Sequence, residues 1–168
     1  MTESYFTPSD AREAIRLFRK AVNQIRLLHR STIPRWSDGI TARFADDRPQ
    51  EDRDEVIIYS DDELQCYREA REVLLRSIEL NPYLPDAYFL LGNAYQEIDN
   101  DSNSMIRYYD QAILLDPEND EFRNARMSFY LSSGDLDRAQ LDLEHLEQLE
   151  SGYAESMREH FNKIKIGR

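Results

Sequence analysis

Apolar residues recur at intervals of three and four along most of the chain, a spacing that is typical of amphipathic helices. The first such stripe runs from Ala11 to Ile25 and follows the helix-start signal Thr7-Pro8-Ser9-Asp10. A second start, Ser60-Asp61-Asp62-Glu63, has the serine and glutamate of a capping box. The pattern predicts helices from about residue 10 to His29, then over 61–80, 85–98, 103–115, 120–132, 135–149 and 153–165.

The helical pattern stops between residues 31 and 60. This stretch holds two prolines, one glycine and many charged residues, with a few apolar positions such as Trp36. A connection of that length without its own periodicity is usually functional or disordered. We therefore expect residues 31–60 to be an irregular linker or insertion.

The C-terminal half contains an internal repeat. Segments that begin at Ala70, Met105 and Ala139 align with one another at offsets of 35 and 34 residues. The segment before Met105 carries Tyr88, Leu91, Gly92 and Tyr95 at the spacing of a first helix that packs on a second. A repeat of this length indicates stacked helix–turn–helix units.

These residues resemble the tetratricopeptide repeat (TPR) family. The likeness is strongest over residues 82–117, with one residue inserted in the turn between the two helices. In the next unit, 118–151, Arg123 and Arg126 stand where the family has apolar residues. The resemblance implies an all-α fold, a short TPR-like right-handed helical solenoid of about 2.5–3 repeats.

Four segments follow from this interpretation: an N-terminal amphipathic helix (1–30), the linker (31–60), the TPR-like repeats (61–151) and a capping helix (152–168). The first repeat has no credible first helix in 48–60. We expect the N-terminal helix to take that place, docking along 61–80 and burying Ile15, Phe18, Val22 and Ile25. The spacing of Ala14, Phe18 and Ala21 imitates the second helix of a repeat, and we interpret it as chance.

Charge and composition narrow the possible functions. The chain has 33 acidic and 21 basic residues, a net charge of −12, which argues against nucleic acid as a partner. All of that excess falls on residues 61–168, whereas the N-terminal helix is basic. A single cysteine, Cys66, excludes an intramolecular disulfide and suits the cytoplasm. No apolar run approaches the length of a membrane span.

Catalytic and metal-binding patterns are weak. His29, His145, His160 and Cys66 fall on four separate predicted helices without metal-ligand spacing, so we expect neither enzymatic activity nor a cofactor. The stretch Asp99–Asp110 imitates an EF-hand calcium loop, but Ser104 stands where a glycine belongs and Asp110 is shorter than the usual glutamate. A helix-capping turn explains the same residues. A calcium-linked regulatory module remains an alternative.

The resemblance also implies a binding surface, because the concave groove of such repeats is lined mainly by first helices. Carried over by alignment, the partner-binding positions are Asp86, Phe89, Asn93, Gln96, Glu97, Glu121, Asn124, Ser128, Leu131 and Ser132. Only Asn93 matches the basic clamp with which some family members hold acidic tails. Phe89 and Leu131 could equally pack against neighbouring side chains.

The sequence therefore predicts a non-catalytic protein–protein interaction module: an adaptor, assembly factor or chaperone. Its acidic groove favours a basic, partly apolar segment of a partner protein. An alternative is a small chaperone similar to those of type III secretion. In a further alternative the groove is already occupied, by the N-terminal helix or by residues 31–60 through Trp36.

Overall fold

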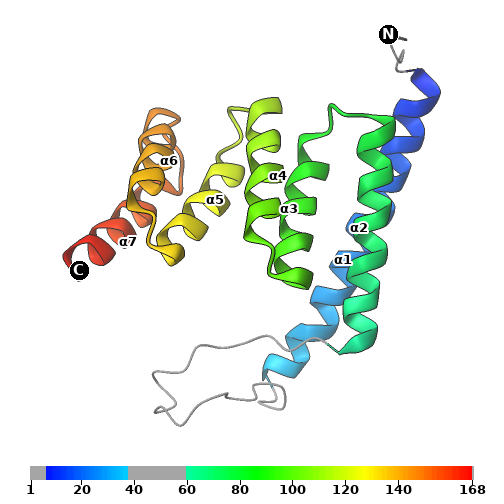
Figure 1. Ribbon diagram of the computed structural model, residues 1–168, viewed down its shortest axis with the longest axis horizontal. Helices are drawn as coiled ribbons and strands as arrows, with labels where there is room; N and C mark the ends of the chain where they lie inside the picture. Colours follow the sequence, from blue (N-terminus) through cyan, green and yellow to red (C-terminus); the bar gives the residue numbers. More distant parts are fainter. Residues whose placement is uncertain (1–6, 38–59, 168) are drawn as a thin grey trace. The chain divides into compact units, whose positions relative to one another are not determined.

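The computed structural model describes residues 7–37 and 60–167, with the backbone alone for residues 27–37. These residues form seven α-helices and contain no strand (Figure 1), so the predicted all-α class is confirmed. The chain divides into two compact units, an N-terminal unit (Met1–Pro82) and a C-terminal unit (Tyr83–Arg168).

The N-terminal unit consists of α1 (Pro8–Ser37) and α2 (Asp61–Leu80). The Thr7 hydroxyl accepts a hydrogen bond from the backbone N–H of Asp10 at 3.2 Å, and Ser60 and Glu63 form the predicted capping box. α2 has the predicted bounds, but α1 continues to Ser37 instead of ending near His29. The apolar periodicity fades after Ile25, yet the sequence offers no glycine stop signal before Gly39.

Small residues form the contact between α1 and α2, which are antiparallel (Figure 1). The Ser77 hydroxyl donates a hydrogen bond to the Ala14 carbonyl at 2.8 Å, which fixes the register. Ala14 and Ala21 are seven residues apart on α1, as Ala70 and Ser77 are on α2, and all four are 0% exposed. In an antiparallel pair, Ala21 therefore lies at the level of Ala70. The spacing interpreted as chance is the packing stripe of α1.

Docking of α1 along α2 agrees with the sequence-based expectation, but the predicted burial of Ile15 was wrong. Ile15 is 38% exposed, and Phe18, Val22 and Ile25 are only half-buried. The alanine stripe occupies the centre of the contact, so these larger residues stand at its flanks. Because the hydrophobic pattern weights large residues, it pointed to the flanks and missed the centre.

The C-terminal unit contains α3 (Pro85–Asp99), α4 (Ser102–Leu115), α5 (Asp120–Ser133), α6 (Leu136–Gln148) and α7 (Ala154–Ile166). Every end lies within one residue of its prediction. α3 pairs with α4 and α5 with α6, while α7 contacts α6 and α5. This succession of helix pairs within one unit is consistent with a helical repeat solenoid.

Local capping explains why the turns fall where they do. α3 ends at Asn100, which adopts a left-handed conformation with φ of 50°, and the Asp101 carboxylate accepts a hydrogen bond from the Ser104 N–H at 3.0 Å. The α5–α6 turn repeats this arrangement with Gly134 (φ 75°) and Asp135. Each turn joins a left-handed residue to an aspartate cap, so the next helix starts in register.

Gly92 allows α3 and α4 to approach closely. A Cβ atom added at this position would lie 2.6 Å from two ring carbons of Tyr109 and 3.1 Å from the Met105 carbonyl oxygen. Only a residue without a side chain fits against that ring. The first helix predicted to pack on a second therefore does so, with its closest approach at Gly92.

Replacing Gly92 with leucine should lower the free energy of unfolding by at least about 1–3 kcal/mol, because the new side chain forces Tyr109 and the α4 backbone away. Urea denaturation of the full chain measures the change. Gly152→Leu is the matched control, since nothing lies within 4 Å of a Cβ at that position. Equal stabilities of the two variants would contradict the packing of α3 on α4.

In the N-terminal unit, Ala14→Leu should destabilise by about 1–3 kcal/mol through overpacking, whereas Ile15→Leu at the neighbouring exposed position should change stability by no more than about 0.5 kcal/mol. Thermal denaturation followed by circular dichroism compares them. A larger loss for Ile15→Leu than for Ala14→Leu would show that the alanine stripe is not the contact.

Candidate functional site

The predicted partner-binding residues lie on α3 and α5, the first helices of the two pairs in the C-terminal unit. We call the surface that they form, together with the neighbouring side of α7, the first-helix face. Asp86, Glu97, Glu121, Ser128 and Ser132 are exposed, while Phe89, Asn93, Gln96 and Asn124 are half-buried. Leu131 alone among the ten is buried, at 2% exposed.

Phe89 and Asn93 are fixed by an aromatic cluster at the base of this face. The Phe89 ring centroid lies 5.2 Å from that of Tyr109 and 4.9 Å from that of Phe122. Asn93 accepts a hydrogen bond from the Tyr109 hydroxyl. Burial, with a further contribution from Glu97, raises the pKa of Tyr109 to about 12, so the hydroxyl keeps its proton at neutral pH. Asn93 is therefore held in one orientation.

Other predicted residues serve their own helices. Gln96 donates a hydrogen bond to Asn100 at 2.7 Å and accepts one from Ser102 at 3.1 Å, so it supports the α3–α4 turn. The hydroxyls of Ser128 and Ser132 each donate to a backbone carbonyl of α5 at 2.8 Å. These three side chains could offer a ligand only their remaining hydrogen-bonding capacity.

Leu131 belongs to the core in which α5, α6 and α7 meet, together with Leu143, Leu146 and Phe161. Leu131 therefore packs against neighbouring side chains and does not line the groove. Its place among the groove positions followed the repeat pattern, which does not show that α7 covers this end of α5. Ser128 also contacts α7, since its hydroxyl lies 4.0 Å from the Met157 sulfur.

Asn124 carries an unusual polar atom. Among the described residues, its side-chain oxygen is buried and has no hydrogen-bond partner. Burial of an unpaired amide oxygen costs about 1–3 kcal/mol. A ligand group that donated a hydrogen bond to this oxygen would remove that cost.

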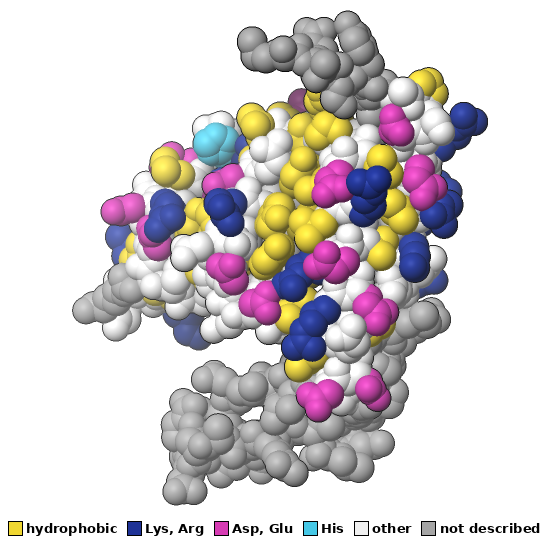
Figure 2. All heavy atoms as spheres, turned by 45° about the vertical axis from the view of Figure 1, so that its right-hand side comes forward, with side chains coloured by type: hydrophobic (Ala, Val, Ile, Leu, Met, Phe, Trp, Pro, Cys, Tyr) yellow, Lys and Arg dark blue, Asp and Glu magenta, His cyan; other side chains and the backbone are white. Residues whose placement is uncertain are grey.

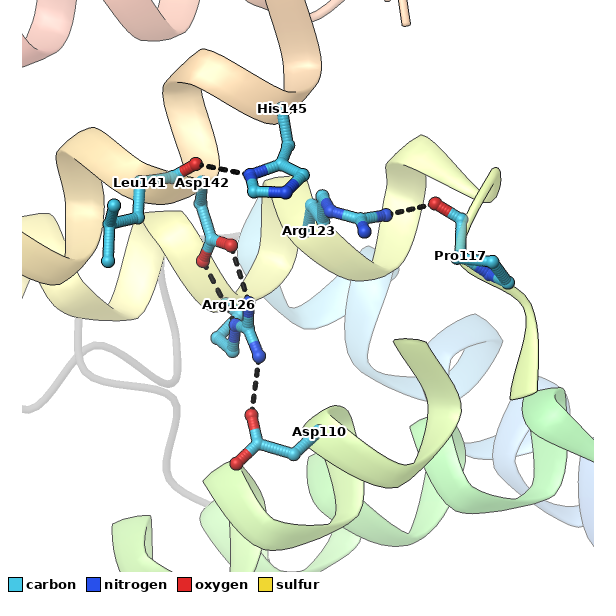
Figure 3. Close-up of polar contacts among 7 residues, drawn as sticks. All are labelled: Asp110, Pro117, Arg123, Arg126, Leu141, Asp142 and His145. Atoms are coloured by element: carbon cyan, nitrogen blue, oxygen red, sulfur yellow. Dashed lines mark hydrogen bonds and ion pairs between the residues drawn. The ribbon is translucent and has the colours of Figure 1, made fainter. Parts of the chain in front are cut away.

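Arg126 joins three helices through ion pairs and was missed as a functional position by sequence reasoning. Figure 3 shows its guanidinium between Asp142 of α6 and Asp110 of α4. Arg126 Nε donates to Asp142 Oδ2 at 3.0 Å, and a second nitrogen bonds the other oxygen of that carboxylate. The Asp142 side chain is only 3% exposed, so Arg126 neutralises a buried charge.

The protonation of Arg126 follows from this geometry. Burial opposes its charge, but the hydrogen bonds and attraction of Asp142, and then of Asp110, outweigh that cost and raise the pKa of Arg126 above its ordinary value. Arg123 differs, since burial lowers its pKa and its guanidinium donates to the Pro117 carbonyl (Figure 3). Both arginines that break the apolar repeat pattern therefore replace packing with directed polar contacts.

The residues of the calcium interpretation, Asp99–Asp110, make other contacts in the structure. Asp101 caps α4, and Asp110 pairs with Arg126. Asn100 ends α3, as the capping explanation requires. Over residues 7–26 and 60–167, no group of three or more His, Cys, Asp or Glu side chains could hold a metal ion.

The residues considered for catalysis lie on four different helices. His145 Nδ1 lies 2.8 Å from the Leu141 carbonyl of its own helix, and His160 is exposed on α7. Burial raises the pKa of the Cys66 thiol on α2, which keeps it protonated and poorly nucleophilic. His29 lies where only the backbone is described. None of the described helices is both long and apolar enough to cross a membrane.

Charge on the surface is mixed. On the face in Figure 2, acidic and basic side chains alternate with hydrophobic ones. On the first-helix face, however, Asp86, Glu97 and Glu121 are exposed, and Arg158 of α7 is paired with Glu147 at 2.8 Å. That face therefore has an acidic excess.

Paired antiparallel helices, with a close Gly–Tyr contact and an exposed row on the first helices, define a helical repeat of the protein-interaction class. A family model described as "Tetratricopeptide repeat" matches residues 85–119. Residues 85–119 thus match a tetratricopeptide repeat, and the resemblance inferred from residues 82–117 is confirmed. Domains of this family are generally non-catalytic and bind other proteins. No curated protein matches this chain.

Arg126→Met should destabilise the C-terminal unit by about 3–5 kcal/mol, because it leaves the buried Asp142 carboxylate unpaired. The control is Arg158→Met, which removes an exposed ion pair with Glu147 worth no more than about 1 kcal/mol. Urea denaturation compares the two variants.

The double variant Arg126→Met with Asp142→Leu should recover most of the lost stability, since it removes both members of the buried pair. A double variant as unstable as the sum of the two single variants would contradict the assigned pairing.

Proposed function

We propose that this protein is a non-catalytic adaptor, assembly factor or chaperone that binds a segment of a partner protein on its first-helix face. The observation that carries the proposal is the row of exposed acidic side chains on α3 and α5, within and next to the matched repeat. Repeats of this family suggest protein partners, and the residues of this face decide which kind.

The proposed ligand is a basic, partly apolar segment. Asp86, Glu97 and Glu121 would raise the local concentration of a cationic partner. Half-buried Phe89, held between Tyr109 and Phe122, offers an aromatic edge for an apolar side chain. After a rotation of its amide, Asn124 would accept a backbone N–H of the bound segment, which would satisfy an oxygen now without a partner.

We also propose a cytoplasmic setting. It rests on the single cysteine, which is a free thiol and half-buried on α2. A reducing compartment suits a chain with one unpaired thiol and no possible internal disulfide.

The binding proposal is tested with a fluorescent basic peptide that carries lysines and leucines, titrated with the full chain in an anisotropy assay. The double variant Glu97→Lys with Glu121→Lys should weaken binding about tenfold or more, mainly through slower association. Binding should also weaken as salt rises from about 50 to about 500 mM, because exposed charges are screened.

The matched control is Asp137→Lys with Glu144→Lys on α6, which makes the same charge change at exposed positions of a second helix. It should bind the peptide nearly as the wild type does. Equal loss in both double variants would mean that only net charge matters. Such a result, or binding insensitive to salt, would refute recognition by the first-helix face.

A further inference from the structure

Outside its contact with α2, α1 carries a regular pattern of basic and apolar residues. Arg12, Arg19 and Arg26 follow one another at intervals of seven residues. Ile15 and Val22 are spaced in the same way beside them. On an α-helix, residues seven apart lie in nearly the same direction and about 10.5 Å apart along the axis. The pattern therefore makes two parallel rows, one cationic and one apolar.

Packing on α2 leaves both rows accessible. The contact with α2 is made by Ala14 and Ala21, which are 0% exposed, whereas the three arginines are exposed. Ile15 is 38% exposed and Val22 is half-buried. The apolar row thus borders the contact instead of filling it.

The cationic row is also unneutralised. Arg12 donates to the Pro8 carbonyl at 3.3 Å and Arg26 to the Asn23 side chain at 3.4 Å, and both partners are uncharged. Within the described residues, none of the three arginines forms an ion pair; the only ion pair of α1 there joins Arg16 to Glu13. Residues 61–168 carry the chain's whole acidic excess, yet the described contacts of these three arginines include no carboxylate.

We propose that this side of α1 is a second binding surface, which pairs with an acidic amphipathic helix of a partner protein. An apolar row flanked by a row of one charge sign, both at seven-residue spacing, is the arrangement by which helices select a partner helix of opposite charge. The partner helix would place one apolar residue against Ile15 and another against Val22. Its glutamates would lie opposite Arg12, Arg19 and Arg26. This surface lies in the N-terminal unit and is distinct from the first-helix face.

Two other anionic ligands fit the observations less well. A helix that lies on a membrane inserts the centre of its apolar side, and on α1 that centre is buried against α2. Nucleic acid would meet the same three arginines but also a chain of net charge −12, and it would make no use of the apolar row.

The test uses the full chain and a synthetic, fluorescent acidic helix of about four heptads with leucine and glutamate at the matching positions. Its composition-matched scramble serves as the reference peptide. In an anisotropy titration the heptad peptide should bind, and the affinity of the scrambled peptide should be lower by at least about tenfold. Arg12→Glu with Arg19→Glu should weaken binding of the heptad peptide by about tenfold or more.

Ile15→Asp should have an effect of similar direction, because it removes the apolar contact. The control double variant Arg68→Glu with Arg76→Glu makes the same charge change on exposed positions of α2 and should bind nearly as the wild type does. Circular dichroism of every variant checks that the helices are retained. Glu97→Lys with Glu121→Lys should leave binding of the acidic helix unimpaired, which separates this surface from the first-helix face.

Three results would overturn the proposal: equal binding of the heptad and scrambled peptides, equal losses in the α1 and α2 double variants, or no binding of the acidic helix at all. Tighter binding to phosphatidylserine vesicles or to a DNA duplex than to the heptad peptide would also overturn it, in favour of a lipid or nucleic-acid ligand.

Discussion

The close approach of antiparallel helices, which only small residues at the crossing allow, is the constraint on which this structure depends. In the C-terminal unit, Gly92 brings the α3 backbone against the Tyr109 ring. In the N-terminal unit, small residues at the crossing bring α1 and α2 near enough for the Ser77 hydroxyl to donate a hydrogen bond to the Ala14 carbonyl. Because small side chains occupy the centre of each contact, longer residues stand at its edges. Those edges and the outward sides of α1, α3 and α5 carry the residues proposed for binding.

In the second helix pair of the C-terminal unit, ion pairs help to fix how the helices pack. Arg126 stands where the repeat pattern has an apolar residue and is held by Asp142 and Asp110. A buried ion pair adds little stability compared with good apolar packing, but it requires all its partners and so fixes one arrangement. The ion pairs of Arg126 with Asp142 and Asp110 account for the irregular position in this repeat.

The helices were predictable because their signals are local. The capping box at Ser60, the aspartates at 101 and 135 and the spacing of apolar residues placed every helix end after α1 within one residue or better. The family resemblance rested on Tyr88, Leu91, Gly92 and Tyr95, which lie inside the matched stretch. The length of α1 was underestimated because its last turns have weak apolar periodicity. The residues of its contact with α2 were missed because alanines, which make it, add little to a hydrophobic pattern.

The site was harder to predict because burial and pairing depend on distant parts of the chain. Leu131 looked like a groove residue until α7 was seen to close over it. Arg126 looked like a defect, although Asp110 and Asp142 stand sixteen residues to either side, close to half a repeat away. That symmetry is a signal that sequence reasoning could have used. Free arginines on α1 could not be recognised, since the sequence does not say which charges are paired.

The central claim is that the outward sides of the first helices bind protein segments, and NMR mapping tests it most directly. The ¹H–¹⁵N spectrum of the full chain would be recorded during titration with the basic peptide. The account predicts that the largest shift changes fall on α3 and α5, including the side-chain amides of Asn93 and Asn124, while amides of α4 and α6 that face away change little. Changes concentrated on α4 and α6, or no changes at saturating peptide, would contradict it.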